Sequence, residues 1–166
     1  MKILVTGGAG YIATHTDIEL LKAGYEIVVV DNLSNSCREA VNRVEHLSGK
    51  RIPFYEVDLV DKKALEDIFV KEKPEAVIHF AGYKAVGESC KVPLRYFSNN
   101  LIGTLNLLEC MEKYQVKKLV FSSSATVYGI PDTVPIKEDF PLSVLNPYGR
   151  TKLIIEDMLR DIYQAD

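Results

Sequence analysis

The sequence predicts a doubly wound parallel α/β sheet with helices on both faces, and three observations support this fold class. Short apolar segments alternate with amphipathic segments along the 166 residues, a pattern typical of parallel strands joined by right-handed helical crossovers. Residues 27–30 read Ile-Val-Val-Val, which indicates a strand covered on both faces. A glycine-rich turn, TGGAGYIA at 6–13, follows the first apolar run, where a tight turn into a helix is needed.

Each element has a local signature in the sequence. The first strand is the apolar run at 3–5, which ends at the glycines. A helix over 11–23 follows from the helical spacing of its apolar residues, and Gly24 ends it. The later elements are predicted as a strand at 27–30, a helix at 37–48, a strand at 52–57, a helix at 61–71, a strand at 76–80, a helix at 93–114, a strand at 118–122 and a helix from Pro147 to the end. The segment 125–146 is predicted to be an irregular loop, of a length that usually serves function.

Composition and charge exclude several classes of protein. Hydrophobic residues make up 47% and charged residues 26% of the chain, as in a soluble globular domain. The net charge of −3 argues against a nucleic-acid-binding protein, which is usually basic. No apolar stretch reaches about 18 residues and the start lacks a signal-peptide pattern, so no membrane segment is predicted. The three cysteines and three histidines are scattered, which predicts reduced thiols, no metal site and a cytoplasmic location.

The glycine-rich turn carries the first functional signal. It matches Gly-x-x-Gly-x-x-Ala, with Gly7, Gly10 and Ala13 at the defining positions. Such glycines let backbone N–H groups approach a pyrophosphate at the positive end of a helix, and the last position allows the helix to pack closely on the strand. Asp31 ends the second strand, where a carboxylate would accept hydrogen bonds from both ribose hydroxyls and repel a 2′-phosphate. The pattern predicts a Rossmann-type domain over 1–166 that binds NAD rather than NADP.

A second motif, Asn-Pro-Tyr-Gly-Arg-Thr-Lys at 146–152, opens the last predicted helix. Asn followed by Pro is a favourable N-cap and first helical residue. Tyr148 and Lys152 are then four residues apart on one helix face, where the ammonium would stabilise a phenolate. Such a tyrosine is a candidate acid/base near neutral pH.

A run of serines, SSSATVYG at 122–129, is predicted at the carboxyl end of the fifth strand, the edge at which open α/β sheets bind ligands. A serine hydroxyl at this edge would bridge a substrate hydroxyl and the tyrosine. For Ser122 and Ser123 the sequence leaves two interpretations open, a functional role and a polar strand end.

Taken together, these motifs and HFAG at 79–82 resemble the extended short-chain dehydrogenase/reductase family, and the resemblance runs from the first residue to the last. The segments FAGYKAVGES and DNLSNS are most similar to those of the family's nucleotide-sugar 4-epimerases. The resemblance implies an NAD-dependent isomerase of galactose metabolism, whose substrate is a UDP-hexose and whose reaction inverts C4 of the sugar.

The resemblance also implies roles for matching positions. Tyr148 would be the base at the sugar 4-hydroxyl, Lys152 would hold the nicotinamide ribose, and Ser124 would hydrogen-bond the sugar oxygen. Asp58 and Leu59 would flank the adenine, and Phe80 to Lys84 would line the nicotinamide side. The implied cofactor-binding set is Gly7, Gly10, Tyr11, Ile12, Asp31, Asn32, Ser36, Asp58, Leu59, Phe80, Ala81, Gly82, Lys84, Asn99, Ser122, Tyr148 and Lys152.

The sequence also departs from family patterns. Sugar-nucleotide 4,6-dehydratases, which resemble this chain, carry Asp-Glu just before Val-Tyr-Gly. Here those positions hold Ala125 and Thr126, neither of which transfers a proton at neutral pH, so epimerisation is favoured over dehydration. Asp17 stands where relatives have an apolar or small residue, and an unpaired carboxylate there is costly if that helix face is buried. Tyr83 replaces a usual leucine beside the nicotinamide side.

Length leaves the activity of the chain open. Such epimerases are about twice as long, so we expect the C-terminal domain that holds UDP and the sugar to be absent and the activity of this chain alone to be low. The alternative is a catalytically silent NAD-binding module of the same fold. The apolar residues of helices 93–114 and 147–163 predict core packing or, because the family pairs subunits through these helices, a homodimer.

Overall fold

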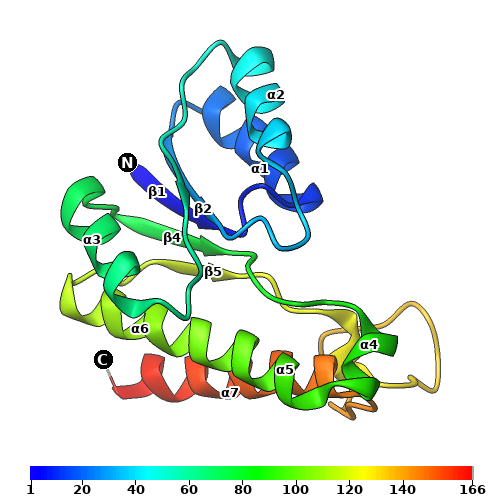
Figure 1. Ribbon diagram of the computed structural model, residues 1–166. Helices are drawn as coiled ribbons and strands as arrows, with labels where there is room; N and C mark the ends of the chain where they lie inside the picture. Colours follow the sequence, from blue (N-terminus) through cyan, green and yellow to red (C-terminus); the bar gives the residue numbers. More distant parts are fainter. Residues whose placement is uncertain (166) are drawn as a thin grey trace. The chain divides into compact units, whose positions relative to one another are not determined.

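The computed structural model describes residues 1–165, which form two compact units (Figure 1). The first unit consists of Met1–Gly82 and Gly103–Ser122, and the second of Tyr83–Ile102 and the residues from Ser123 onward. Asp166, the last residue of the expected domain, lies outside the described residues. In chain order the elements are β1 (Lys2–Thr6), α1 (Tyr11–Lys22), β2 (Glu26–Asp31), α2 (Arg38–Ser48), β3 (Phe54–Glu56), α3 (Lys62–Glu72), β4 (Ala76–His79), α4 (Val86–Lys91), α5 (Pro93–Phe97), the π-helical turn η1 (Ser98–Ile102), α6 (Gly103–Lys113), β5 (Leu119–Phe121), the 3-10 turn η2 (Ala125–Tyr128) and α7 (Pro147–Ala165).

The first unit is built on a parallel sheet with the strand order β3-β2-β1-β4-β5. The central strand β1 pairs with β2 on one side, where Val5 is opposite Val29, and with β4 on the other, where Val5 is opposite Ile78. This order confirms the predicted doubly wound sheet. The chain adds β2 and β3 on one side of β1 and then crosses to add β4 and β5 on the other side. Ligands of open α/β sheets bind at the carboxyl edge beside such a reversal of strand order.

Both faces of the sheet are covered, as Figure 1 shows for α1 and α2 on one side and α3 and α6 on the other. Successive strand residues point to opposite faces, so the core forms two clusters. Leu4 and Val28 belong to the cluster with α3 and α6, whereas Val5 and Val29 belong to the cluster with α1 and α2. The continuous apolar runs of β1 and β2 are therefore explained by burial on both faces.

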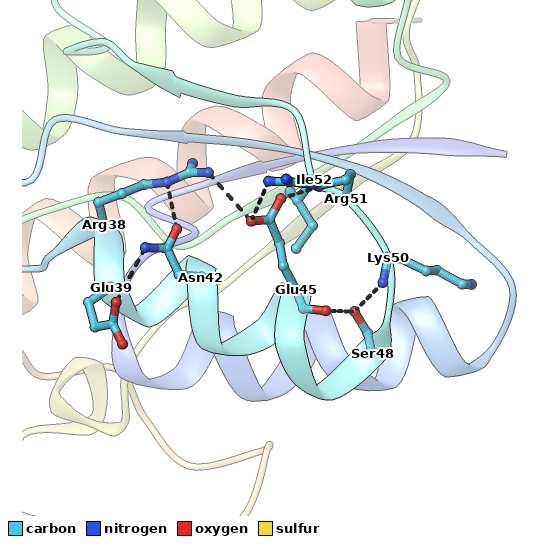
Figure 2. A network of polar contacts seen from close by, with 8 residues as sticks. All are labelled: Arg38, Glu39, Asn42, Glu45, Ser48, Lys50, Arg51 and Ile52. Atoms are coloured by element: carbon cyan, nitrogen blue, oxygen red, sulfur yellow. Dashed lines mark hydrogen bonds and ion pairs between the residues drawn. The ribbon is translucent and has the colours of Figure 1, made fainter.

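A polar network ties α2 to the chain that enters β3 (Figure 2). The carboxylate of Glu45 accepts a hydrogen bond from the backbone N–H of Ile52 at 2.8 Å, and its other oxygen lies 3.7 Å from Arg38 Nη2 and 3.8 Å from Arg51 Nη1. The Arg38 guanidinium also lies over the ring of Phe54, 4.3 Å from its centroid. These contacts hold α2 against the start of β3, the strand that pairs with β2.

The predicted helix 93–114 is not continuous, which corrects the sequence interpretation. A π-helical turn, η1, separates α5 from α6, and a further helix, α4, precedes them. Asn100, inside the π turn, is buried and holds the backbone of Tyr83 with both amide atoms. An extra residue per turn is stable only where tertiary contacts compensate for it, and those contacts are invisible to helical periodicity. Helix α4 ends at Lys91, and its C-cap Val92 leaves the helical conformation, with φ −132° and ψ 58°, as the clash with the following Pro93 favours.

The other boundaries follow the prediction closely. The strands at 52–57, 76–80 and 118–122 are shorter than predicted, each by one to three residues. Helix α1 ends before Gly24, which adopts a φ of 87°. The N-cap of α7 is confirmed, because the backbone N–H of Gly149 donates to Asn146 Oδ1 at 2.8 Å and Pro147 is the first helical residue. Every helix within residues 1–165 is too short or too polar to cross a lipid bilayer.

Candidate functional site

The glycine-rich turn between β1 and α1 is built by close backbone packing. Gly7 adopts a φ of +68° and donates its N–H to the carbonyl of Val30 at 2.7 Å. A Cβ at this position would lie 2.6 Å from the backbone nitrogen of Ala81 and 2.7 Å from its Cα. Only glycine satisfies both the left-handed backbone and this approach, so the turn lies directly against the segment that follows β4.

The first turn of α1 fits an anion. Gly10 is the N-cap, it makes no side-chain capping hydrogen bond, and the first turn holds no acidic residue. The positive end of the helix therefore has no side chain that balances it. Two large side chains at this end, Tyr11 and Ile12, which belong to the predicted cofactor-binding set, are 76% and 56% exposed. Ala13, one position on, is buried in the core, in line with its predicted packing role.

Asp31, at the end of β2, accepts hydrogen bonds within the protein and is also the predicted acceptor for a ribose. Its Oδ2 accepts the backbone N–H of Ala9 at 3.0 Å, and its Oδ1 accepts the N–H of Leu33 at 2.9 Å and the hydroxyl of Ser36 at 2.8 Å. A carboxylate has about four acceptor positions, so one remains for a ribose hydroxyl. A hydrogen bond to a second hydroxyl requires one of the present donors to move. Sequence reasoning missed this clamp between the glycine-rich turn and the loop after β2.

The ends of β2 and β3 are joined by a side-chain hydrogen bond. Asn32 Nδ2 donates to Asp58 Oδ2 at 2.8 Å, which fixes two residues of the predicted adenosine side. Leu59, by contrast, is buried as part of the hydrophobic core, and its carbonyl accepts a hydrogen bond from Asn106 at 2.9 Å. The side chain of Leu59 therefore stabilises the sheet.

The carboxyl ends of β4 and β5 lie beside the same turn. The N–H of Phe80 donates to the carbonyl of Thr6 at 3.0 Å, and the N–H of Ser122 donates to the carbonyl of His79 at 3.1 Å. His79 is fully buried with its ring nitrogens 2.6 Å and 2.9 Å from the hydroxyls of Thr6 and Thr104, as expected of a structural histidine. The predicted residues Phe80 to Gly82 and Ser122 thus belong to the sheet edge that carries Gly7 in the first unit.

The second unit carries the Tyr–Lys pair. Tyr148 and Lys152 lie in the first turns of α7, are 8% and 5% exposed, and the Lys152 Nζ is 6.0 Å from the centroid of the Tyr148 ring. Burial lowers the pKa of Lys152 to about 8. A poorly hydrated ammonium favours an anionic or lone-pair partner, so a phenolate or a ribose hydroxyl suits this position.

The other predicted site residues of the second unit are Ser124, Lys84 and Asn99, and each has a different environment. The hydroxyl of Ser124 accepts hydrogen bonds from the N–H of Thr126 at 3.2 Å and from its Oγ1 at 3.0 Å. Lys84 is exposed, and Asn99 donates to Oδ1 of Asn100 at 2.9 Å. Tyr83, a departure from relatives, lies beneath the Arg95 guanidinium at 4.6 Å from the ring centroid.

Asn100 is a buried residue that sequence reasoning missed. Its Nδ2 donates to the carbonyl of Tyr83 and to Thr151 Oγ1, both at 3.0 Å, and Thr151 in turn donates to the carbonyl of Tyr148 at 2.7 Å. The doubled Asn at 99–100 is the only signal in the sequence, and it does not indicate partners so far along the chain. Among residues 1–165, no group of three or more His, Cys, Asp or Glu side chains is arranged to hold a metal ion.

The fold and these two groups of residues define a class of protein. A doubly wound sheet with a glycine-rich first turn, an acid at the end of β2 and a Tyr-x-x-x-Lys pair on a later helix is the arrangement of a nucleotide-dependent α/β enzyme of the extended short-chain dehydrogenase/reductase type. Residues 4–166 match the family described as GDP-mannose 4,6 dehydratase, and the chain belongs to that family.

Relatives within this family are named as epimerases. The chain is 64% identical over 166 residues to a UDP-glucose 4-epimerase of Bacillus subtilis, and 62% identical over 165 residues to one of Dictyostelium discoideum. These matches cover 100% and 99% of this chain but 49% and 48% of the relatives. The chain therefore spans about half the length of the curated relatives it matches.

Solved structures similar to this chain are also named as UDP-glucose 4-epimerases. A UDP-glucose 4-epimerase from Bifidobacterium longum in complex with NAD+ and UDP matches with a TM-score of 0.98 and 52% identity, over 100% of this chain and 50% of that chain. A UDP-glucose 4-epimerase of Thermus thermophilus in complex with NAD matches with a TM-score of 0.91 and 39% identity, over 99% of this chain and 51% of that chain.

Proposed function

We propose that residues 1–166 form the NAD-binding part of a UDP-glucose 4-epimerase, which inverts C4 of a UDP-hexose. The observation that carries the proposal is the buried Tyr148–Lys152 pair at the start of α7, on a chain that is 64% identical to a named epimerase. The pair supplies an acid/base, and the glycine-rich turn with Asp31 supplies a dinucleotide site.

The residues of the first unit fit NAD. The uncapped start of α1 would face the pyrophosphate, Asp31 would accept from the adenosine ribose, and Asn32 with Asp58 would border the adenine. The carboxylate of Asp31 disfavours a 2′-phosphate by charge, so NAD is preferred to NADP. When bound, NAD supplies the site that takes up and returns the hydride of the sugar C4.

The residues of the second unit would handle the proton and hold the substrate. Tyr148, as the phenolate, would take the proton of the sugar 4-hydroxyl, and the resulting phenol would return it after the sugar has presented its other face. The Lys152 ammonium would hold the nicotinamide ribose and stabilise the phenolate of Tyr148. The burial of Lys152 would strengthen its attraction to the phenolate, because opposite charges attract more strongly away from water. The Ser124 hydroxyl would hydrogen-bond the sugar 4-oxygen and so orient it toward the tyrosine.

Epimerisation is favoured over dehydration, although the family model is named after a dehydratase. Loss of water from a sugar needs an acid and a base next to the tyrosine, and the resemblance locates them just before Val-Tyr-Gly. Ala125 and Thr126 occupy these positions, and neither side chain exchanges a proton at neutral pH. The named relatives at 64% and 62% identity are epimerases.

The proposal includes a cytoplasmic location and a homodimer. All three cysteines are free thiols, as is usual for proteins of a reducing compartment. In the second unit, Leu94 on α5 and Ile162 and Tyr163 on α7 are large exposed apolar side chains. Such residues on the helices of 93–114 and 147–163 support pairing of two copies.

Replacing Tyr148 with phenylalanine is expected to abolish turnover of UDP-galactose while bound NAD is retained. The phenol carries the proton in the reaction, whereas the ring keeps its packing without the hydroxyl. A coupled NADH assay on purified protein measures turnover, and the absorbance and mass of the copurified dinucleotide measure cofactor content.

The same assay separates the proposal from its alternative. Half the length of the relatives favours a catalytically silent NAD-binding module, which would retain NAD without turnover in the chain as given. Turnover by the wild type that disappears in Tyr148→Phe supports the epimerase. A Tyr148→Phe variant as active as the wild type contradicts the assignment of the base.

Replacing Asp31 with alanine is expected to weaken NAD binding about tenfold or more and to remove the preference over NADP. The change deletes the acceptor for the ribose and the charge that repels a 2′-phosphate. It also deletes three hydrogen bonds within the protein, so the melting temperature falls as well. Calorimetric titration with both cofactors measures the preference.

The comparison variant for Asp31→Ala is Ser36→Ala. Because Ser36 itself belongs to the predicted cofactor-binding set, the two variants are compared in their preference for NAD over NADP and not in affinity. It removes one of the same three hydrogen bonds and keeps the carboxylate. A variant Asp31→Ala that still prefers NAD as strongly as Ser36→Ala would refute the ribose role of the carboxylate.

A further inference from the structure

Ser123 forms a side-chain hydrogen bond to a residue that has no role in the proposed reaction. It is the middle serine of the run 122–124 and directly precedes Ser124. Its hydroxyl donates a hydrogen bond to Oε1 of Glu156 on α7. The other carboxylate oxygen of Glu156 accepts from Arg160 Nη2 at 3.2 Å, and only 21% of the Glu156 side chain is exposed. An ionised acceptor held by an arginine makes this bond stronger than one between neutral groups.

Glu156 lies on the same face of α7 as Tyr148 and Lys152. It follows Lys152 by four residues and Tyr148 by eight, and residues four apart are neighbours on one helix face. The helix that carries the proposed acid/base thus also carries the anchor of the serine segment. Ser123 is 33 residues away from that anchor in the sequence.

The serine segment is attached to α7 at a second point. A Cβ on Gly149, the residue after Tyr148, would lie 3.1 Å from both the carbonyl oxygen and Oγ1 of Thr126. The first turn of α7 therefore packs closely against η2. Thr126 in turn donates to the hydroxyl of Ser124 from its N–H and its Oγ1.

The two attachments lie on either side of Ser124 in the chain. Packing of Thr126 on Gly149, together with the hydrogen bond from the N–H of Ser143 to the carbonyl of Val127 at 2.9 Å, holds the segment on the C-terminal side of Ser124. The hydrogen bond of Ser123 to Glu156, two helical turns further along α7, holds it on the N-terminal side, so Ser124 lies between two fixed points. Misplacement of a reacting group by about 1 Å costs up to about a hundredfold in rate, so the anchor bears on catalysis.

We propose that Glu156 is a positioning residue, which binds the hydroxyl of Ser123 and thereby fixes Ser124 relative to Tyr148 and Lys152. The inference rests on the proposed function, in which Ser124 and Tyr148 act on the same sugar oxygen. It resolves the two interpretations that the sequence leaves open for Ser123, because the hydroxyl is an anchor rather than a solvated strand end.

The test uses the form that the proposed function implies, an epimerase whose NAD-binding part is this chain. Ser123→Ala is expected to lower kcat for UDP-galactose, per bound NAD, roughly tenfold to a hundredfold, with a smaller change in KM. Glu156→Leu is expected to do the same, whereas Glu156→Gln keeps an acceptor oxygen and most of the activity. The double variant Ser123→Ala/Glu156→Leu is expected to be no slower than the slower single variant, because both remove one bond.

The measurement separates positioning from mere stability. A purely structural contact would lower the melting temperature and leave kcat per bound NAD at the wild-type value, and that result in Ser123→Ala or Glu156→Leu overturns the inference. Additive losses in the double variant overturn it too. A wild type without turnover, or an active Tyr148→Phe, instead overturns the proposed function. With Tyr148→Phe inactive and Ser123→Ala fully active, the proposed function stands and this inference falls.

Discussion

Replacing Asp17 with asparagine is expected to raise the stability of the chain at neutral pH and to flatten its dependence on pH. Asp17 is 0% exposed on α1, and neither carboxylate oxygen has a hydrogen-bond partner among the described residues. Burial raises the pKa of this carboxyl from 3.8 to about 8. At neutral pH the folded protein must therefore hold a proton that the unfolded chain releases.

The sign of the effect follows from that proton. Between pH 3.8 and about 8 the folded state binds a proton that the unfolded state lacks, so stability falls as pH rises across this window. Below pH 3.8 both states are protonated, so the cost of the raised pKa is absent and stability is at its full value. One pH unit is worth about 1.4 kcal/mol, so the cost near pH 7 is on the order of 4 kcal/mol. Asparagine keeps the shape and cannot ionise.

Urea unfolding at several pH values measures this difference. The free energy of unfolding of Asp17→Asn should exceed that of the wild type by roughly 1.5 kcal/mol at pH 5 and by about three times as much at pH 8. The matched control is Asp161→Asn, since Asp161 is exposed on α7 and its replacement should leave the curve unchanged. Parallel pH curves for the wild type and Asp17→Asn would contradict the assignment of a buried, protonated carboxyl.

Replacing Gly7 with alanine is expected to abolish NAD binding and to destabilise the first unit by about 3 kcal/mol or more. The left-handed backbone costs a side chain about 1 to 2 kcal/mol. The new Cβ would also meet backbone atoms of Ala81 at 2.6 Å and 2.7 Å, and overpacking of this kind adds about 1 to 3 kcal/mol. Relief of the clash moves the glycine-rich turn away from the segment after β4, so the phosphate-binding backbone loses its shape.

Gly49→Ala separates the two causes. Gly49 has a φ of +67°, nearly that of Gly7, but no atom lies within 4 Å of a Cβ built there. This control therefore includes the backbone cost and excludes the clash. Thermal unfolding and calorimetric titration with NAD measure both variants. A loss for Gly7→Ala no larger than for Gly49→Ala would show that close packing at Gly7 does not matter.

Much of the fold could be predicted because its signals are local. The apolar runs of β1 and β2, the position of Gly24 after α1 and the Asn-Pro start of α7 each depend on a few adjacent residues. Backbone preferences and capping act over such short distances. The pairing of Tyr148 with Lys152 is also local, since four residues along a helix bring two side chains onto one face.

Other features depended on residues that are far apart in the sequence. The π turn at 98–102 exists because Asn100 binds the backbone of Tyr83 and the side chain of Thr151. The anchor of Ser123 is 33 residues away, on Glu156. No periodicity in one segment contains information about such partners, because a hydrogen bond across the fold forms only after both elements have packed.

The sequence by itself determined the alternation of strands and helices, the glycine-rich turn with its acid at Asp31, and the Tyr–Lys pair, because each arises from short-range geometry. Only the tertiary structure decided that Asp17 is buried without a partner among residues 1–165, that Asp31 also clamps the turn, and that Ser123 is anchored to α7. Burial and hydrogen-bond partners are properties of packed neighbours, which a linear pattern does not specify.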